Sequence, residues 1–268
     1  MAFPRAEILD RLDKNVETLI GTLGAGRAAK TQFLAEINSP GASGKASPFL
    51  KSLFPEVGLA ATIERSLITS LGRGWDHMAA SVARAAYGGG TAGVFVTGTI
   101  PAVTENAIND IVLAYTSGSG HPSPDTSKEL KAILPTVTFP GARATVREKD
   151  DLFFTRATVE NHIEIKTPKL NYDQGRAAKR RILRIHAVKA PTVVEVFVGL
   201  PYNPNGLFGV YQWPTTKYFL DPSRDLKIGR EFWNYVGDSS DTYEELLDCF
   251  LTVANARRTD LIKLLEEV

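Results

Sequence analysis

The spacing of apolar residues first predicts helices in the N-terminal part of the chain. Between residues 6 and 20 apolar side chains recur every three or four positions, and the same spacing runs from about residue 60 to residue 86. Glycines near residues 72–74 interrupt the second pattern. Shorter patterns predict helices over residues 105–116 and 242–265. Residues 1–130 are therefore expected to form a mainly helical part.

The centre of the chain changes to the short apolar runs that are typical of β-strands. Residues 92–96 predict a short strand or a buried turn, and residues 174–187 predict a helix with Asp173 as its N-cap. The predicted strands cover residues 136–139, 144–148, 151–157, 162–167 and 193–200, of which the last is the most continuous.

This order of elements indicates an α/β fold with a central mixed β-sheet flanked by helices. No stretch of the sequence has the composition of a linker. We therefore expect one domain over residues 1–268, with the sheet and the main ligand-contacting surface in residues 131–268.

Composition narrows the class of protein only slightly. The 268 residues are 43% hydrophobic and 23% charged, and the net charge of +1 argues neither for nor against a polyanionic partner. Cys249 is the single cysteine, so the chain has no internal disulfide, and we expect its thiol to be buried. No apolar run has the length of a membrane span, and no export signal is found at the N-terminus. We expect a cytoplasmic protein without a membrane partner.

The most informative stretch lies between residues 149 and 169. Side chains of a strand alternate between its two faces, so Glu164 and Lys166 share one face. If Asp151 starts the preceding strand and residues 159–162 form the turn, the hairpin brings Asp151 beside Glu164. Two carboxylates and an ammonium suit metal-assisted phosphodiester hydrolysis, with Mg²⁺ held by Asp151 and Glu164 and the carbonyl of Ile165 as a candidate further ligand.

A plainer interpretation of the same residues remains open. Glu164 and Lys166 can form a solvated strand face, and Asp151 can be an ordinary turn residue. The apolar neighbours favour the functional interpretation, because a charged row on a buried strand is costly unless it has a role. His162 beside this row is expected to pack or to form hydrogen bonds rather than to catalyse.

A basic block follows this stretch. Residues 174–194 contain no acid, and the block can hold phosphates near the proposed metal or form a solvated basic helix. Gln174 and Arg176 can orient a phosphate or cap the helix, while Asn203 and Asn205 are candidates for base recognition that the sequence does not separate from surface residues. The basic residues of the block are Arg176, Lys179, Arg180, Arg181, Arg184 and Lys189.

These motifs carry a resemblance to known nucleases. Asp151 followed after twelve residues by Glu164-Ile165-Lys166 resembles the PD-(D/E)XK nuclease superfamily, with Asp150 in the place of the motif's proline. Residues 64–75, 201–206 and 228–237 are similar to segments of type II restriction endonucleases, and the likeness extends over roughly residues 60–250.

The resemblance implies a Mg²⁺-dependent endonuclease that acts as a homodimer on double-stranded DNA. Each subunit would cut one strand of a short palindromic site, and some relatives by this resemblance cut sites of the GGNCC kind. It also implies that Glu64 brings one more carboxylate to the metal or to Lys166, although Glu64 can equally be a surface residue.

Two other functions remain open at this point. The same fold can serve a repair nuclease that recognises DNA structure or damage, and a DNA-binding protein without catalysis can be built on the basic block. A nucleotide-binding loop at residues 21–26 lacks both a preceding strand and the Lys-Ser/Thr ending that such loops have.

Overall fold

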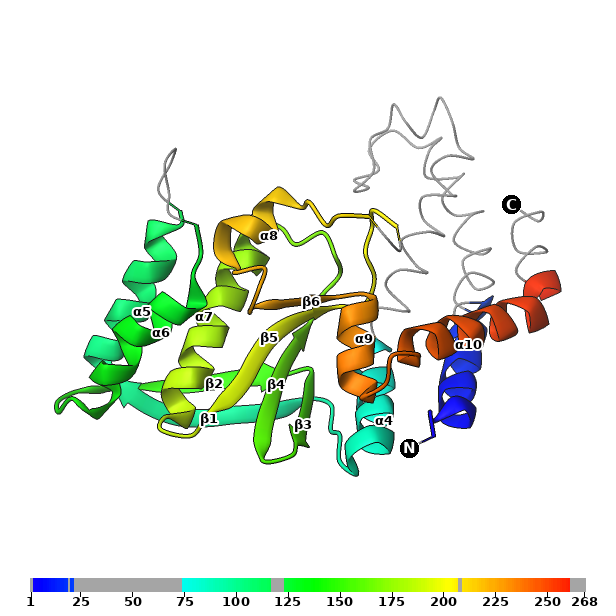
Figure 1. Cartoon of the computed structure of the whole chain (residues 1–268), viewed down its shortest axis with the longest axis horizontal. Helices are drawn as coiled ribbons and strands as arrows, with labels where there is room; N and C mark the ends of the chain where they lie inside the picture. Colours follow the sequence, from blue (N-terminus) through cyan, green and yellow to red (C-terminus); the bar gives the residue numbers. More distant parts are fainter. Residues whose placement is uncertain (1, 19, 22–73, 117–122, 207–208, 261–268) are drawn as a thin grey trace, which may run out of the picture. The chain divides into compact units, whose positions relative to one another are not determined.

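The computed structural model describes residues 2–18, 20–21, 74–116, 123–206 and 209–260 (Figure 1). The chain divides into two compact units. One unit consists of Met1–Pro4 and Trp75–Glu244, and the other of Arg5–Gly74 and Glu245–Val268. Within the described residues no helix is long and apolar enough to cross a membrane.

Two helices are described in the second unit. Residues 5–18 form the first, as predicted, and α10 (Thr242–Ala256), which starts in the first unit, supplies the second. Arg257 donates two hydrogen bonds to the Asp13 carboxylate, from Nε and from Nη2, each at 2.6 Å. Cys249 on α10 is a buried free thiol, as the composition predicts.

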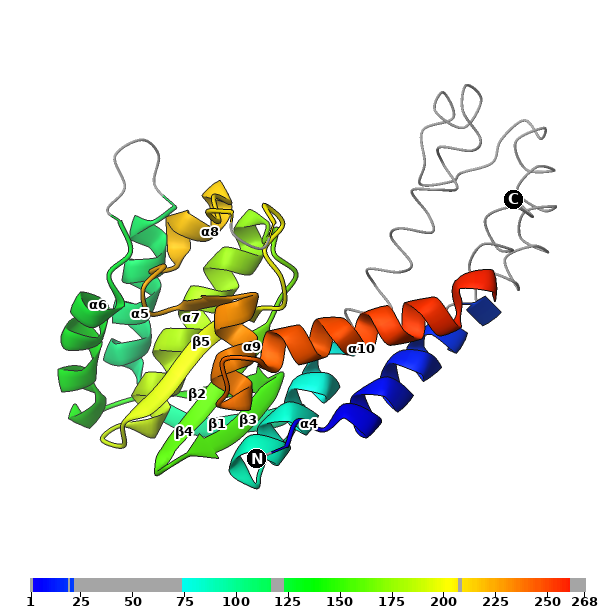
Figure 2. The same ribbon diagram turned by 45° about the vertical axis from the view of Figure 1, so that its right-hand side comes forward.

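The first unit contains the described strands, in two sheets. A four-stranded mixed sheet has the order β3-β4-β5-β6, with β3 antiparallel to β4 and the other neighbours parallel, and β1 pairs antiparallel with β2 in a separate ribbon (Figure 2). This confirms the predicted α/β class. The elements are α4 (Trp75–Tyr87), β1 (Val94–Pro101), α5 (Ala102–Ala114), α6 (Thr126–Ile133), η1 (Leu134–Thr138), β2 (Arg143–Asp150), β3 (Leu152–Arg156), β4 (Val159–Ile165), α7 (Tyr172–Lys189), β5 (Val194–Leu200), α8 (Pro214–Phe219), β6 (Leu226–Ile228) and α9 (Arg230–Gly237).

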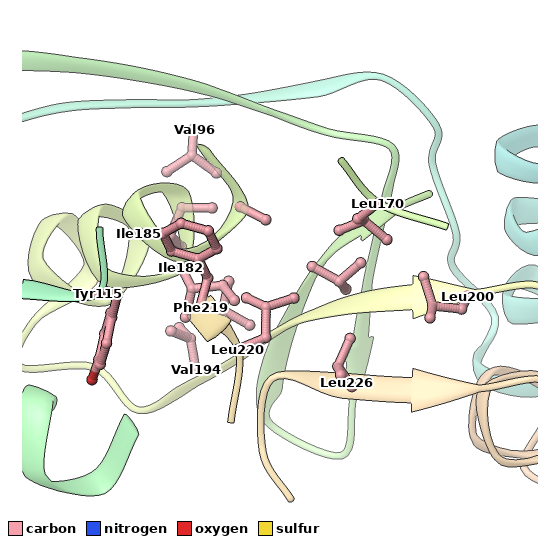
Figure 3. Packing of buried hydrophobic residues seen from close by; sticks show 13 residues of the cluster. Val96, Tyr115, Leu170, Ile182, Ile185, Val194, Leu200, Phe219, Leu220 and Leu226 are labelled. Atoms are coloured by element: carbon pink, nitrogen blue, oxygen red, sulfur yellow. The ribbon is translucent and has the colours of Figure 1, made fainter. Parts of the chain in front are cut away.

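Helix α7 covers one face of the four-stranded sheet. Its apolar side chains, among them Ile182 and Ile185, pack with the alternate residues of β5 from Val194 to Leu200 (Figure 3). The residues of β5 alternate between faces, so Phe197 and Gly199 lie on the opposite face. The buried run that the sequence predicts at 193–200 is therefore a strand with helices on both sides.

Helices α4 and α9 cover that opposite face. The rings of Tyr87 and Phe154 stack with their centroids 4.8 Å apart. Gly199 allows the Phe232 ring of α9 to approach the strand, because a Cβ at this position would lie 2.4 Å from a ring carbon. Any larger residue at Gly199 would push α9 away from the sheet.

The hairpin that carries the predicted site turns earlier than expected. Residues 159–162 belong to β4, and the turn consists of Ala157 and Thr158, with Ala157 at a φ of 55°. The prediction of a turn at 159–162 was therefore wrong. A two-residue loop with a positive φ matches the twist of the paired strands, and the register Leu152↔Ile163 still brings Asp151 level with Glu164.

Three other sequence predictions need correction. The predicted strand at 136–139 lies largely within the helical turn η1, where Pro135 occupies an early position that suits a helix start. Helix α7 begins two residues earlier than predicted, with Asn171 as the N-cap instead of Asp173. The short strand or buried turn predicted at residues 92–96 is the start of a longer strand, β1, which covers Val94–Pro101.

A buried lysine connects α7 to α6 and to the segment before β6. Lys179 is 0% exposed, and its ammonium lies 2.7 Å from Glu129 and 2.6 Å from Asp225. The hydroxyl of Thr126 accepts a third hydrogen bond from it at 2.8 Å. All donors of the ammonium are thus used inside the protein, which is the arrangement a buried charge requires.

We expect Lys179→Met to destabilise the fold strongly, because it leaves Glu129 and Asp225 as buried carboxylates without a cation. The loss should be about 3–5 kcal/mol in the free energy of unfolding, measured by urea denaturation. Lys131→Met on α6, where the side chain is exposed, should change it by less than about 0.5 kcal/mol. Equal stability of the two variants would contradict the structural role of Lys179.

Candidate active site at the junction of the two sheets

Asp151 lies at the junction between the two sheets. Strand β2 ends at Asp150 and β3 begins at Leu152, so one continuous stretch of chain leaves the ribbon and enters the four-stranded sheet at Asp151. The amide of Asp151 donates to the carbonyl of Ile163 at 2.9 Å, and its carboxylate Oδ2 accepts from the amide of Ile165 at 2.9 Å. The side chain is thereby held against the end of β4.

Glu164 and Lys166 meet at that same end of β4. Glu164 Oε1 lies 2.8 Å from Lys166 Nζ, with 13% of the glutamate side chain and 31% of the lysine side chain exposed. The amide of Lys166 donates to Gly199 on β5 at 3.0 Å, which fixes the backbone just beyond the strand. The structure therefore brings Asp151, Glu164 and Lys166 together, as the alternation of side chains predicts.

The electrostatics of this group suit a divalent cation. Burial raises the pKa of Asp151, the amide of Ile165 and the charge of Lys166 oppose the rise, and the charge of Glu164 adds to it. Glu164 Oε2 is buried, and no hydrogen-bond partner for it is found among the described residues. A divalent ion between the two carboxylates would relieve their repulsion and satisfy this oxygen, so the residues present fit such an ion.

The described residues supply only two acidic side chains, Asp151 and Glu164, for this ion. No group of three or more such side chains that could hold a metal ion is found in the described ranges. The carbonyl of Ile165 therefore stays a predicted ligand. Glu64, the predicted additional carboxylate, lies outside the described residues.

Asp150 forms a buried clamp beside Asp151. Its carboxylate is 0% exposed and forms an ion pair with Arg181 of α7. Arg181 also donates from Nε to the carbonyl of Lys149 at 3.1 Å. On the other side, His162 Nδ1 lies 2.7 Å from Asp150 Oδ2, and its Nε2 lies 3.1 Å from Glu160. The prediction that His162 forms hydrogen bonds is confirmed.

Sequence reasoning missed the role of this clamp. In the sequence Asp150 only takes the place of the motif's proline, and Arg181 is only one cation of the basic block. The signal available in the sequence is an acid directly before Asp151 on an apolar strand, which must find a cation when it is buried. Nothing in the sequence says which cation, because Arg181 follows 31 residues later.

The predicted phosphate contacts at the start of α7 have local partners. Gln174 Oε1 accepts from the amide of Asn171 at 2.9 Å and completes a capping box, so the alternative of helix capping is confirmed for this residue. Arg176 forms an ion pair with Asp173 at 3.1 Å. Gln174 is half-buried, and its side-chain nitrogen has no hydrogen bond that the structure describes.

Further along α7, the structure places the next two candidates differently. Lys179 is buried in the cluster with Glu129 and Asp225, a position that DNA does not reach. Arg180 is half-buried and donates from Nε to Asn109 Oδ1 at 3.1 Å.

The two candidate base-reading asparagines shape the loop after β5. The side-chain nitrogen of Asn203 donates to the carbonyl of Gly209 at 2.5 Å, and that of Asn205 donates to the carbonyl of Val210 at 2.7 Å. Asn205 also donates its backbone amide to the Asn203 side chain at 3.0 Å. Both residues therefore hold the loop in shape, whatever the loop contacts.

The raised pKa of Asp151 predicts a stabilising substitution. An ionised carboxylate with a raised pKa destabilises the fold, and this penalty is absent below the unfolded-state pKa of about 4 and grows as the pH rises above it. We expect Asp151→Asn to unfold at a higher temperature than the wild type at pH 7 without divalent ions, and the difference to vanish toward pH 4. Thermal unfolding by circular dichroism measures this. Asp110→Asn, at an exposed position of α5, serves as the control, and an Asp151→Asn protein less stable than the wild type at pH 7 would contradict the argument.

The clamp predicts a large loss of stability when its cation is removed. Arg181→Met leaves the buried carboxylate of Asp150 without its arginine, which should cost about 3–5 kcal/mol in the free energy of unfolding. Adding Asp150→Asn removes the buried charge and should recover a large part of that loss in urea denaturation. If the free energy of unfolding of Arg181→Met lies within about 0.5 kcal/mol of the wild-type value, the Asp150–Arg181 pair does not stabilise the fold.

The geometry agrees with what comparison with known proteins finds. A family model described as type II restriction endonuclease HinfI matches residues 10–254. The chain is 29% identical over 223 residues to the type II restriction enzyme HgiEI of Herpetosiphon aurantiacus, with 81% of each chain covered, and equally similar to HgiBI of that organism. The type II restriction enzyme HgiCII of the same organism is 27% identical over 236 residues, covering 86% of this chain and 85% of its own. The chain therefore belongs to the HinfI family of type II restriction endonucleases, which are site-specific deoxyribonucleases.

Proposed function

We propose that Asp151, Glu164 and Lys166 are the catalytic residues of this endonuclease and that the metal ion is Mg²⁺. The observation that carries the proposal is the meeting of the three side chains at one end of β4, with Asp151 bonded to the amide of Ile165 and Glu164 paired with Lys166 at 2.8 Å. Type II restriction endonucleases generally use a divalent metal, and oxygen ligands such as these suit Mg²⁺. The carbonyl of Ile165 is proposed as a further ligand.

Each residue has a distinct task in this proposal. A Mg²⁺ ion held by Asp151 and Glu164 would supply a Lewis acid that lowers the pKa of water and offsets charge on the phosphate. Asp151 and Glu164 hold the cation in one place because both are fixed to the end of β4. Lys166, held by Glu164, places its ammonium beside the attacked phosphate, where it orients the water and balances the negative charge that develops.

The finer points of substrate recognition are also part of the proposal. The enzyme acts as a homodimer on a short palindromic site, since two-fold symmetry of protein and site lets each subunit cut one strand. A site of the GGNCC kind is the first to test. Glu64 is proposed as an additional carboxylate near the metal.

The proposed DNA contacts come from two places near the site. Gln174, Arg176 and Arg180 of α7 are proposed to contact phosphates with donor groups that their local partners leave available. Asn203 and Asn205 are proposed to contact the bases from the loop after β5, whose shape they hold. Lys179 is not among the proposed contacts, because its ammonium is buried and bound to two carboxylates.

Digestion of a phage DNA of known sequence, with Mg²⁺ and with EDTA, tests the proposed function. We expect discrete fragments with Mg²⁺ and none with EDTA, and sequencing of the fragment ends identifies the site. A smear, or cutting only at mismatches or branches, would instead favour the repair nuclease with the same fold.

Lys166→Met tests the catalytic assignment directly. We expect the rate of cleavage to fall by about 100-fold or more, because the charge near the phosphate is lost, while binding of the same DNA measured by gel shift remains. Lys169→Met, three residues further along and exposed, should cleave at the wild-type rate. If Lys166→Met cleaves normally, or if it no longer binds DNA, the proposed role of Lys166 is wrong.

A further inference from the structure

The ribbon of β1 and β2 has one face turned inward and one turned to solvent. Its register pairs Phe95 with Lys149 and Thr97 with Arg147, and the inward residues Val96 and Val146 are buried. Exposure alternates along both strands. The outward row consists of Phe95, Thr97, Thr99, Arg143, Thr145, Arg147 and Lys149.

The outward row carries positive charge without any acid. Its charged members are Arg143, Arg147 and Lys149, while the carboxylate of Glu148 points the other way and pairs with Arg184 of α7 at 3.0 Å. Among the described residues none of the three cations pairs with a carboxylate. Arg143 donates to Thr99, at 2.9 Å to its hydroxyl and 2.8 Å to its carbonyl, and Arg147 lies over the ring of Phe95 at 4.2 Å.

The basic block of α7 differs sharply from this row. Five of its six cations pair with carboxylates of the same chain, and Arg180 is bound to Asn109. The charge that looks most prominent in the sequence is therefore largely neutralised. On the ribbon, by contrast, none of the three outward cations pairs with a carboxylate of the described residues.

The row also leads directly to the candidate active site. Lys149 precedes Asp151 by two residues and Arg147 precedes it by four, so their Cα atoms lie at most ~7 and ~14 Å from it, the reach of a fully extended chain. Arg181 donates to the carbonyl of Lys149 at 3.1 Å and holds this part of the ribbon in place. Long basic side chains at these positions can therefore reach phosphates close to one bound at Asp151.

We propose that the outward face of the β1–β2 ribbon binds the sugar-phosphate backbone of DNA next to the scissile phosphate. This rests on the proposed function, because it takes Asp151 as the place where the phosphate is attacked. Lys149 and Arg147 supply charge, the hydroxyls of Thr97 and Thr145 are further donors, and Phe95, which is 49% exposed, supports the guanidinium of Arg147. Duplex DNA is the occupant because it is a polyanion and the row is purely cationic.

The test compares two variants with the same change in net charge. One is Lys149→Gln with Arg147→Gln, and the control is Lys131→Gln with Lys217→Gln, which removes two exposed cations from α6 and α8. Binding to a duplex of random sequence in EDTA is measured from about 0.05 to 0.3 M KCl. The slope of log Kobs against log salt should become shallower by ~2 for the ribbon variant, and binding near 0.1 M should weaken on the order of 10- to 100-fold. The control should match the wild type.

The other outcomes count against the proposal. An unchanged slope for the ribbon variant, or an equal loss in the control, would overturn it. A change in oligomeric state by sedimentation with an unchanged slope would also overturn it and assign the face to a second copy of the chain. The binding test and the digestion with Mg²⁺ can fail separately. If the wild type cleaves DNA but the ribbon variant binds it as the wild type does, only the proposed role of the ribbon is wrong. If the wild type never cleaves DNA, the proposed function is wrong.

Discussion

The hydrogen bond from the amide of Ile165 to the carboxylate of Asp151 is the contact on which the candidate active site depends. It joins the start of β3 to the end of β4 at 2.9 Å, where the chain passes from the ribbon to the four-stranded sheet. The backbone of β4 therefore fixes the position of the Asp151 carboxylate beside Glu164. The buried pair of Asp150 and Arg181 fixes the same point to α7 from behind.

The site is built at the expense of local stability. Burial raises the pKa of Asp151, and one buried oxygen of Glu164 has no hydrogen-bond partner in the part of the chain that the structure describes. Both features oppose folding in the absence of a cation, and both would be relieved by one. Active sites commonly retain such unfavourable groups because the surrounding fold is stable enough to hold them. Here the packing of α7 on β5 and the Asp150–Arg181 pair supply that support.

The sequence predicts the parts of the fold that follow from local periodicity. The alternation of side chains correctly places Glu164 and Lys166 on one face, and the apolar run at 193–200 is indeed a buried strand. The turn at Ala157 could not be predicted, because alanine is not a residue type that indicates a positive φ. The burial of Lys179 in the basic block could not be predicted, because its carboxylate partners lie 46 and 50 residues away in the sequence. The cationic row of the ribbon is also invisible until β1 and β2 are paired.

The central claim is that Asp151 and Glu164 hold one divalent ion beside Lys166. Mn²⁺ binding followed by electron paramagnetic resonance tests this most directly, because it reports the ion without any cleavage. The account predicts that the wild type binds a Mn²⁺ ion that Glu164→Gln does not bind, with both proteins equally folded by circular dichroism. Equal binding of Mn²⁺ by the two proteins would contradict it.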